Sequence, residues 1–272
     1  MRLNGSYIGT TPAPSTLAAP GIWTLDEAAR YQQAGAWPKF LPVVPVTTGL
    51  VAWYMADFGT LDASGNQIST DNTAIATWQD QSGNNYHITQ STSGNRPAWR
   101  SSANGQNSLP IVSFNGSSSF LQAATSIGIS GTSARTVFTV QKDYNPGASV
   151  YPAVLYWGAA SSGAYYAHTF NNSLAYIDNY ASSASVAISA GSFSVLTSKI
   201  NATPRVQIRR NGGSWSVNGT AFNTTNSALT VGRGITNAYL NTTVAEILIY
   251  NQNLSDTDCA SVESYLRARW GF

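Results

Sequence analysis

From Gly49 onward the chain is a succession of short apolar or alternating runs, separated by clusters of glycine, asparagine, serine and aspartate. Runs of this length suit β-strands, whereas helices that could build a core need a longer apolar periodicity. Many short strands at close intervals are typical of an antiparallel sandwich or barrel. The pattern therefore predicts an all-β domain, with strands at 50–54, 76–79, 111–114, 135–141, 153–157, 164–170, 174–177, 186–188, 193–200, 205–210, 213–217, 229–231 and 243–250.

The clearest hairpin turns at Asn211 and Gly212, which are residue types that adopt the positive φ of a tight turn. The strand before the turn alternates between apolar and polar residues. Because successive side chains point to opposite faces, Val206 and Ile208 should face the core. Arg209 should then lie on the opposite face, which we expect to be in water.

The run 243–250 is apolar on nearly both faces, which predicts a central strand covered on both sides. Ser255 then caps a final helix, Asp256 and Asp258 stand near its positive N-terminus, and Gly271 ends it. The side chains that recur at helical spacing and would pack against the sandwich are Cys259, Val262, Tyr265 and Leu266.

Up to Thr47 the chain lacks the strand pattern seen after Gly49. Repeated prolines divide this region into segments too short to form a core. We therefore place an N-terminal arm at residues 1–47 and a single sandwich at residues 48–272. The arm should hold one short helix, capped by Thr24 and ended by Gly35. Its large apolar side chains exceed what the arm can bury alone, so we expect it to dock, on its own sandwich, on a partner or on another copy. These anchoring side chains are Trp23, Leu25, Tyr31 and Trp37.

Three ordered segments carry a resemblance that spans the predicted sandwich. They are 49–54 with 78–84, then 110–116, and finally 244–250 with the helix that ends at Trp270 and Gly271. Together they resemble the concanavalin A-like, laminin-G-type jelly-roll family of bacterial surface proteins, secreted modules and tailed-phage virion proteins. The resemblance implies a two-layered antiparallel jelly-roll sandwich that binds carbohydrate or proteins at loop-lined edges, in some members through calcium.

The arm carries a second resemblance, over 21–27 and 35–38. These residues resemble a segment near the start of tailed-phage virion proteins. The resemblance implies a protein that assembles in the host cytoplasm and becomes part of the virion, as a capsid decoration or a tail component. It fits the lack of an apolar secretory signal after Met1.

The composition argues against two classes of partner. Charged residues make up only 10% of the chain, the net charge is +2, and no run of lysine or arginine could follow a phosphate backbone, which argues against nucleic acid. No apolar stretch approaches the ~20 residues that span a bilayer, so we expect no membrane insertion. Cys259 is the sole cysteine, so no disulfide can form within the chain.

The sequence lacks the acid pairs that glycoside cleavage requires. The glutamates are Glu27, Glu246 and Glu263, and none has an acidic neighbour two residues away, although glycosidases on related jelly rolls place two carboxylates on one strand. The close pair Asp256 and Asp258 is expected to serve the helix cap. No Gly-X-Ser-X-Gly elbow or cluster of metal-ligating residues is present. We therefore predict no catalytic residue, no enzyme and no cofactor.

Asp80 is the carboxylate whose role is least obvious. We expect it to bond the backbone amides of Ser82 and Gly83 and so stabilise a turn. Calcium needs several oxygen ligands, and Asp80 with Asn84 could only begin such a set, so calcium stays an alternative and no metal site is predicted. His87 should be a hydrogen-bonded residue of the same turn.

Sugar-binding sites combine an aromatic face, which stacks on a pyranose, with polar side chains that bond its hydroxyls. Sandwich cores also use tryptophan and tyrosine, so packing is the alternative at each such position. Tyr180 stands beside a serine-rich loop and is the candidate most expected to be exposed. The glycan-binding candidates are Trp157, Tyr165, Tyr166, Asp178, Asn179, Tyr180, Trp215 and Arg233.

These patterns lead to one hypothesis and two alternatives. The hypothesis is a phage virion structural protein, anchored to other virion proteins through its arm, that displays a lectin-like jelly roll to host glycans or partner proteins. We expect a symmetric homo-oligomer, because assembly multiplies weak single-site affinity. A carbohydrate-binding module of a bacterial surface protein is the alternative, and an enzyme ranks behind both.

Overall fold

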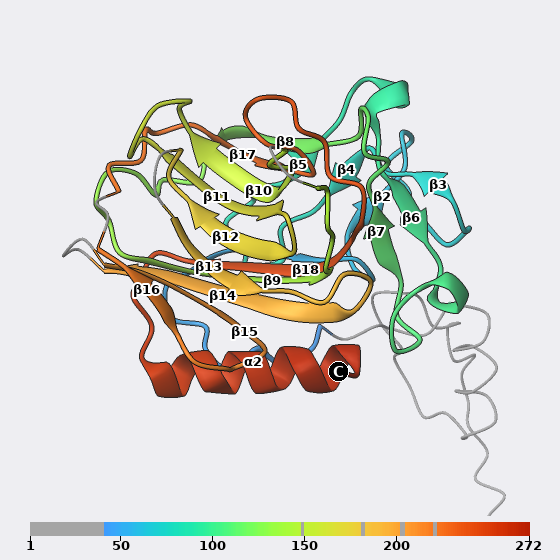
Figure 1. Ribbon diagram of the computed structural model, residues 1–272. Coiled ribbons are helices and arrows are strands. Elements are labelled where there is room, and N and C mark those ends of the chain that lie inside the picture. Colours follow the sequence, from blue (N-terminus) through green and yellow to red (C-terminus); the bar gives the residue numbers. More distant parts are fainter. Residues whose placement is uncertain (1–40, 148–149, 181–182, 202–204, 220–221) are drawn as a thin grey trace, which may run out of the picture. The chain divides into compact units, whose positions relative to one another are not determined.

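The computed structural model describes residues 41–147, 150–180, 183–201, 205–219 and 222–272 (Figure 1). The chain divides into two units, residues 1–43 and 44–272. The second unit begins earlier than Thr48, because Val44 is buried in its core and Tyr250 Oη donates to the carbonyl of Val46 at 2.9 Å. The predicted arm helix and the anchoring side chains Trp23, Leu25, Tyr31 and Trp37 lie outside the described residues.

The second unit is a sandwich of two antiparallel nine-stranded sheets, which confirms the predicted all-β fold (Figure 1). The first sheet, in spatial order, is β16 (Ser216–Asn218), β15 (Arg205–Arg210), β14 (Phe193–Asn201), β9 (Arg135–Lys142), β18 (Thr243–Tyr250), β7 (Ile111–Ser113), β6 (Ala98–Arg100) and β3 (Thr73–Ala74), with β1 (Leu50–Met55) paired to β18. The second sheet is β13 (Ser183–Ala187), β12 (Leu174–Asp178), β11 (Tyr165–Asn171), β10 (Ala153–Gly158), β17 (Ala228–Val231), β8 (Leu121–Ser126), β5 (Ile88–Thr89), β4 (Thr77–Trp78) and β2 (Thr60–Leu61).

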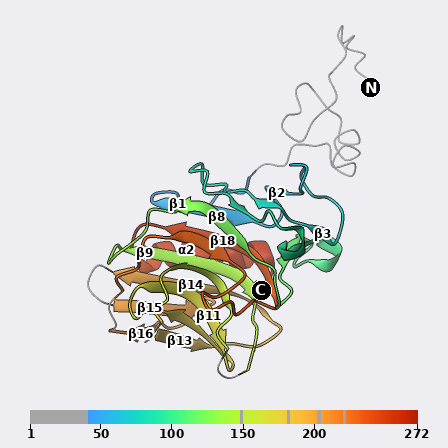
Figure 2. The ribbon, with the colours of Figure 1, turned by 90° about the horizontal axis from the view of Figure 1, so that it is seen from above.

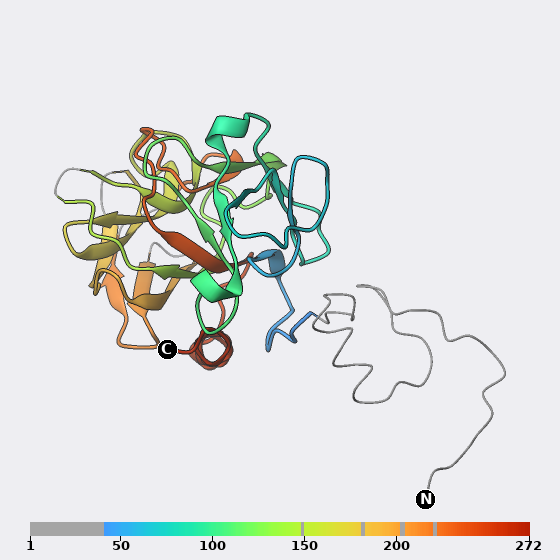
Figure 3. The same cartoon turned by 90° about the vertical axis from the view of Figure 1, so that its right-hand side faces the viewer.

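Short 3-10 turns η1 (Ser93–Asn95) and η2 (Ser102–Asn104) lie in the connections around β6. Helix α2 (Asp256–Trp270) lies against the outer face of the first sheet, so the layers run helix, first sheet, second sheet (Figures 1 and 3). The caps are as predicted, since Ser255 Oγ accepts from the Asp258 amide at 3.0 Å and Gly271 has φ +72°. Within the described residues, α2 and the other helices are too short or too polar to cross a bilayer.

The predicted hairpin is confirmed, with φ of +52° at Asn211 and +72° at Gly212. Val206 and Ile208 are fully buried between the sheets. The expectation that Arg209 lies in water is wrong. Helix α2 covers that face, and Arg209 is buried.

Strand β18 is buried on both faces, as predicted for a central strand, because the second sheet covers one face and α2 the other. The interior between the sheets holds large side chains that include Trp157 and Tyr166, whereas Phe138 lies on the opposite face of the first sheet, on the side of Thr197 and α2. The rings of Trp157 and Tyr166 lie 4.1 Å apart, in the range of stacked aromatic pairs. The two sheets therefore share one continuous core.

One edge of the sandwich is closed by strands from both sheets. β13 ends the second sheet and β16 ends the first, and the two strands lie next to each other (Figure 2). The side-chain amide of Asn218 in β16 donates to the carbonyl of Ser183 in β13 at 3.0 Å. A covered edge offers fewer free backbone groups to a foreign strand. This edge is therefore less suited to a binding site than the outer faces of the sheets.

Candidate binding face

The outer face of the second sheet carries an array of tyrosines. In the register of the sheet, Tyr156 of β10 lies opposite Ala167 of β11, and Ala167 lies opposite Asp178 of β12. Alternate residues of a strand share a face, so Tyr165 and Tyr176 lie on this side as well. Strand register therefore gathers side chains from three strands onto one surface.

We call this surface the tyrosine face, and its members are Tyr151, Tyr156, Tyr165, Tyr176 and Tyr180. Ring centroids lie 5.5 Å apart for Tyr156 and Tyr165, 6.0 Å for Tyr165 and Tyr180, and 6.2 Å for Tyr151 and Tyr176. These separations are those of interacting aromatic pairs. The rings thus form two groups of interacting aromatics, Tyr156 with Tyr165 and Tyr180, and Tyr151 with Tyr176.

Exposure divides the tyrosine face into a base and an accessible layer. Tyr156 and Tyr165 are 8% and 2% exposed, and they pack with Ile235 in a small apolar cluster separate from the main core. Tyr151 and Tyr180 are 46% and 43% exposed. The buried Tyr165 therefore supports the exposed ring of Tyr180, while Tyr176 supports that of Tyr151.

Tyr180 is held in an unusual backbone conformation. Its φ is +74°, the left-handed region that costs a non-glycine residue of order 1–3 kcal/mol. Asp178 Oδ1 accepts from the Tyr180 amide at 2.7 Å, which is the local bond that stabilises such a turn. The strained turn places the Tyr180 ring at a position whose backbone conformation favours glycine. Backbone strain of this kind clusters at functional sites.

The tyrosine face is uncharged apart from Asp178. Burial raises the pKa of the Asp178 carboxyl, and hydrogen bonds from the Tyr180 amide partly oppose that rise. Burial likewise raises the pKa of Tyr165 and Tyr176, so their phenols stay protonated at neutral pH. The surface therefore offers phenol donors, aromatic faces and one carboxylate acceptor, a combination that suits the hydroxyls and apolar face of a sugar.

Of the predicted candidates, the structure brings Tyr165, Asp178 and Tyr180 together. Trp157 and Tyr166 instead oppose each other across β10 and β11 on the inner side, where both are fully buried. Asn179 is also fully buried and has a polar partner. The expectation that Trp157, Tyr166 and Asn179 touch a ligand is corrected, because none of the three has accessible surface.

The remaining two candidates lie elsewhere. Trp215 belongs to the first-sheet side, where its ring lies 4.7 Å from Lys199 Nζ and 4.2 Å from the Arg209 guanidinium. Arg233 stacks 3.9 Å from the ring of Phe120 and donates to Asn237 Oδ1 at 2.9 Å. Neither contributes to the tyrosine face.

Sequence reasoning missed Tyr151, Tyr156 and Tyr176. Tyr176 precedes Asp178 by two residues in a strand, so the pattern alone places both on one face. The spacing of two residues was therefore the feature of the sequence that could have identified Tyr176. Tyr151 and Tyr156 flank the start of β10, where the register of the sheet shifts, and the sequence alone does not indicate which side they face.

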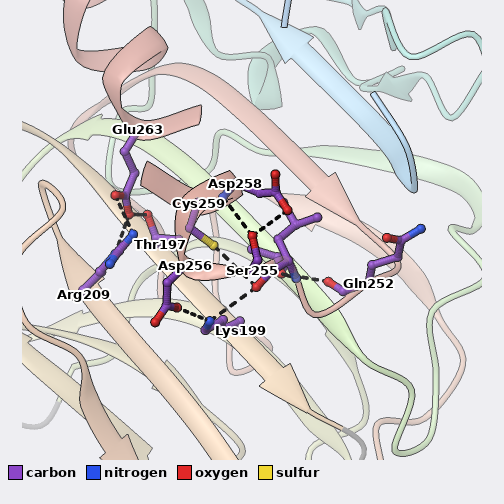
Figure 4. A network of polar contacts seen from close by, with 11 residues as sticks. Thr197, Lys199, Arg209, Gln252, Ser255, Asp256, Asp258, Cys259 and Glu263 are labelled. Carbon is purple, nitrogen blue, oxygen red and sulfur yellow. Dashed lines mark hydrogen bonds and ion pairs between the residues drawn. The ribbon is translucent and has the colours of Figure 1, made fainter. Parts of the chain in front are cut away.

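On the other side of the sandwich, carboxylates that could suggest catalysis are engaged in structural contacts (Figure 4). Glu263 binds Arg209 through both carboxylate oxygens at 2.8 Å and accepts from the Thr197 hydroxyl. Asp256 binds Lys199 Nζ at 2.5 Å. These groups tie α2 to β14 and β15.

Glu246 sits beneath the C-terminal part of α2 and is fully buried. Its oxygens accept from the indole N–H groups of Trp53 at 2.8 Å and Trp270 at 2.7 Å, and the guanidinium of Arg269 lies 3.2 Å away. Burial raises the pKa of the Glu246 carboxyl, and Arg269 opposes that rise. The carboxylate thus docks the helix and has no surface open to a substrate.

His168 Nε2 and Ser198 Oγ lie 2.6 Å apart, a separation expected of a catalytic base and its nucleophile. Both are fully buried between the sheets, and the other ring nitrogen of His168 contacts the Thr139 hydroxyl at 3.0 Å rather than a carboxylate. Desolvation lowers the pKa of His168 to about 3. The pair is therefore a neutral part of the core.

Asp80 stabilises the turn through the Ser82 amide, as predicted, but its other backbone donors are Trp53 and Tyr86 rather than Gly83. Its Oδ1 accepts from the amides of Ser82 and Trp53, and its Oδ2 accepts from the amide of Tyr86, all within 3.0 Å. His87 Nδ1 accepts from the Asp80 amide at 3.0 Å. Across the described ranges, no three histidine, cysteine, aspartate or glutamate side chains gather as a metal site.

Comparisons with known proteins support the fold. No protein-family model matches the sequence, and a comparison with curated proteins finds no match. Among solved structures, the chain is similar to domain 4 of AbnA, a GH43 extracellular arabinanase from Geobacillus stearothermophilus, in complex with arabinotriose. The identity is 14%, the TM-score is 0.55, and the match covers 79% of this chain and 98% of that domain.

Two further structures are similar over part of their own length. A GH54 α-L-arabinofuranosidase matches with 17% identity and a TM-score of 0.60, over 89% of this chain and 65% of that one. The binding domain of Paraclostridial Mosquitocidal Protein 1 matches with 12% identity and a TM-score of 0.58, over 83% of this chain and 53% of that one. At such identities the likeness establishes the β-sandwich fold.

Proposed function

We propose that residues 44–272 form a non-catalytic carbohydrate-binding module, with the tyrosine face as its binding surface. The observation that carries the proposal is the exposed ring of Tyr180, held beside Asp178, together with the exposed ring of Tyr151, which packs on Tyr176, on a face that no described helix covers. Aromatic rings stack on the apolar side of a sugar, and a carboxylate accepts from its hydroxyls. Domain 4 of the arabinanase, which shares the fold, was crystallised with arabinotriose.

The chemistry of the tyrosine face supports binding without cleavage. Glycoside hydrolysis needs two carboxyl groups about 5 to 9.5 Å apart. Asp178 is the carboxylate that the described residues place beside these tyrosines, while Glu246 and Glu263 are buried under α2. A surface with one acid can hold a sugar and has no second group to activate water.

The test is a glycan array followed by calorimetric titration, with arabinotriose among the probes. We expect binding that falls by up to about tenfold in Tyr180→Ala, because one stacked ring contributes roughly 0.5–1.5 kcal/mol. Val217→Ala is the matched control, since Val217 is 45% exposed on β16 at the edge of the first sheet. A silent array, or equal affinity in the two variants, would reject the tyrosine face as a glycan site.

We further propose that the module is displayed on a phage particle, as a capsid decoration or tail component anchored by residues 1–47. The support is the resemblance of 21–27 and 35–38 to a segment of tailed-phage virion proteins. The expected result is that the protein is found in purified particles and is lost from them when residues 1–45 are deleted. Normal incorporation of the truncated protein would favour the alternative, a module of a bacterial surface protein.

A further inference from the structure

A second hollow crosses the outer face of the first sheet, where α2 ends. Its volume is about 520 Å³, within the roughly 300–1,000 Å³ of ligand pockets. The Gln106 side chain, on its rim, donates to the carbonyl of Trp270, the last residue of α2, at 2.9 Å. We call this hollow the sheet groove, and its floor is formed by Arg100, Ser113, Thr243, Lys142 and Phe193, from β6, β7, β18, β9 and β14.

Lys142 gives the sheet groove a free positive charge. Its ammonium group is exposed, and none of the ion pairs formed among the described residues involves it. The adjacent carboxylate, Asp143, is buried and pairs with Arg210 at 2.8 Å. An anion bound in the groove would therefore meet Lys142 without displacing an internal partner.

Arg100 adds hydrogen-bond donors without adding net charge. Its Nε and Nη2 bind the two carboxylate oxygens of Asp71 at 3.2 and 3.1 Å. Hydrogen bonds from the Ser101 amide and from Arg100 lower the pKa of Asp71 to about 2, so this carboxylate is ionised and offsets the guanidinium. The Nη1 group is not used in that pair. The net charge of the groove is thus the single charge of Lys142.

Two serines in the lining of the groove favour a ligand that carries hydroxyl groups. The Oγ1 of Thr243 is covered by protein atoms, so it is not open to a ligand. The hydroxyls of Ser113 and Ser192 line the same groove. Phe193 adds a half-buried aromatic side chain that can pack on the apolar side of a ring.

We propose that the sheet groove is a second binding site, separate from the tyrosine face, for a short saccharide that carries one carboxylate. Lys142 pairs with the carboxylate, and Ser113 and Ser192 hydrogen-bond the sugar hydroxyls. Phe193 packs against a pyranose ring. One free cation matches one acidic group, and the volume of about 520 Å³ lies in the range of small-ligand pockets.

The test compares two trisaccharides by calorimetric titration of the full chain: glucuronosyl-xylobiose, which carries one carboxylate, and xylotriose, which carries none. We expect the acidic sugar to bind about tenfold more tightly, as for a hydrogen bond to a charged group. Lys142→Gln should reduce its affinity to that of xylotriose. Arg267→Gln is the matched control, because it removes an exposed positive charge from α2, outside the groove.

Three results would overturn the proposal: no binding of the acidic sugar, equal affinity for the two sugars, or equal effects of Lys142→Gln and Arg267→Gln. Tyr180→Ala separates this site from the tyrosine face. It should leave the binding of glucuronosyl-xylobiose unchanged. If it abolishes that binding, the acidic sugar occupies the tyrosine face, so the proposed function stands and the second site is rejected.

Discussion

The part of the first sheet that α2 covers and the tyrosine face of the second sheet use polar residues in opposite ways. Under α2, Arg209, Glu246 and Glu263 are paired with other protein groups. On the second sheet, Tyr151 and Tyr180 are nearly half exposed and interact mainly with neighbouring rings. Polar groups with internal partners stabilise the fold, whereas those that face solvent are available to a ligand. Substitutions on the two faces should therefore separate stability from binding.

The largest expected effect is on the covered face. Glu263→Leu leaves Arg209 buried without its partner, which should lower the free energy of unfolding by about 3–5 kcal/mol. The double variant Arg209→Met with Glu263→Leu should regain most of that loss, because no buried charge remains unpaired. Chemical denaturation measures the free energy of unfolding of the single and the double variant. A loss below about 1 kcal/mol in the single variant would mean that this face is not closed as described.

The next effect is the pH dependence of stability that comes from His168, which lies between the two sheets. The pKa of His168 is about 3 in the folded protein and 6.5 when unperturbed, so below pH 6.5 the unfolded chain binds a proton that the folded chain does not. The contribution of neutral His168 to the free energy of unfolding is complete above pH 6.5. It decreases as the pH falls towards 3. Between pH 7 and pH 5 the loss should be about 2 kcal/mol.

His168→Gln provides the comparison, because glutamine keeps hydrogen bonds in the core and does not titrate. We expect unfolding curves of this variant to lack the His168 contribution to the pH dependence. Parallel stability profiles for the wild type and the variant would contradict the buried, neutral state of His168.

A smaller effect should have opposite signs for stability and binding. Tyr180→Gly removes the cost of a left-handed φ, so the protein should become more stable by about 1 kcal/mol while its affinity for the glycan falls by up to about tenfold. Thermal unfolding and titration of the same preparation measure both quantities. Lower stability would show that the Tyr180 ring is a packing residue rather than a ligand contact.

The smallest effect concerns Asp178. Its folded-state pKa is raised, so the folded protein loses stability as the pH rises from 3.8 through that raised value. Asp178→Asn keeps an oxygen for the Tyr180 amide and should be more stable than the wild type at pH 7 by less than about 1 kcal/mol. Glycan affinity should fall only a few-fold. A stability difference that is the same at pH 3 and pH 7 would contradict this prediction.

The sequence predicted the long strands and the final helix well, because each has its own periodicity and caps. β15 and β18 have the predicted bounds, and α2 is capped by Ser255 and Gly271 as expected. β2, β3, β5, β6 and β8 were missed. Three of them, β2, β3 and β5, have two residues, which is too short to show alternation, whereas β8 has six. Their pairing depends on contacts between distant parts of the chain.

The site was predictable only in part, for a geometric reason. Tyr165 and Tyr166 are adjacent, so one had to face the core and the other the outside, and the sequence does not show which. Arg209 was expected in water because the sequence does not reveal which face a helix far along the chain will cover. Tyr176 and Asp178, at a spacing of two, were the pair from which the outer face could have been inferred.

The central claim is that ligands meet the tyrosine face. Hydroxyl-radical footprinting, with and without a saturating glycan from the array, tests it directly, because it reports the solvent exposure of each side chain. We expect the oxidation of Tyr151, Tyr176 and Tyr180 to decrease with the glycan and that of Val217 to stay unchanged. Protection of a different surface, or full oxidation of these three tyrosines in the bound state, would contradict the account.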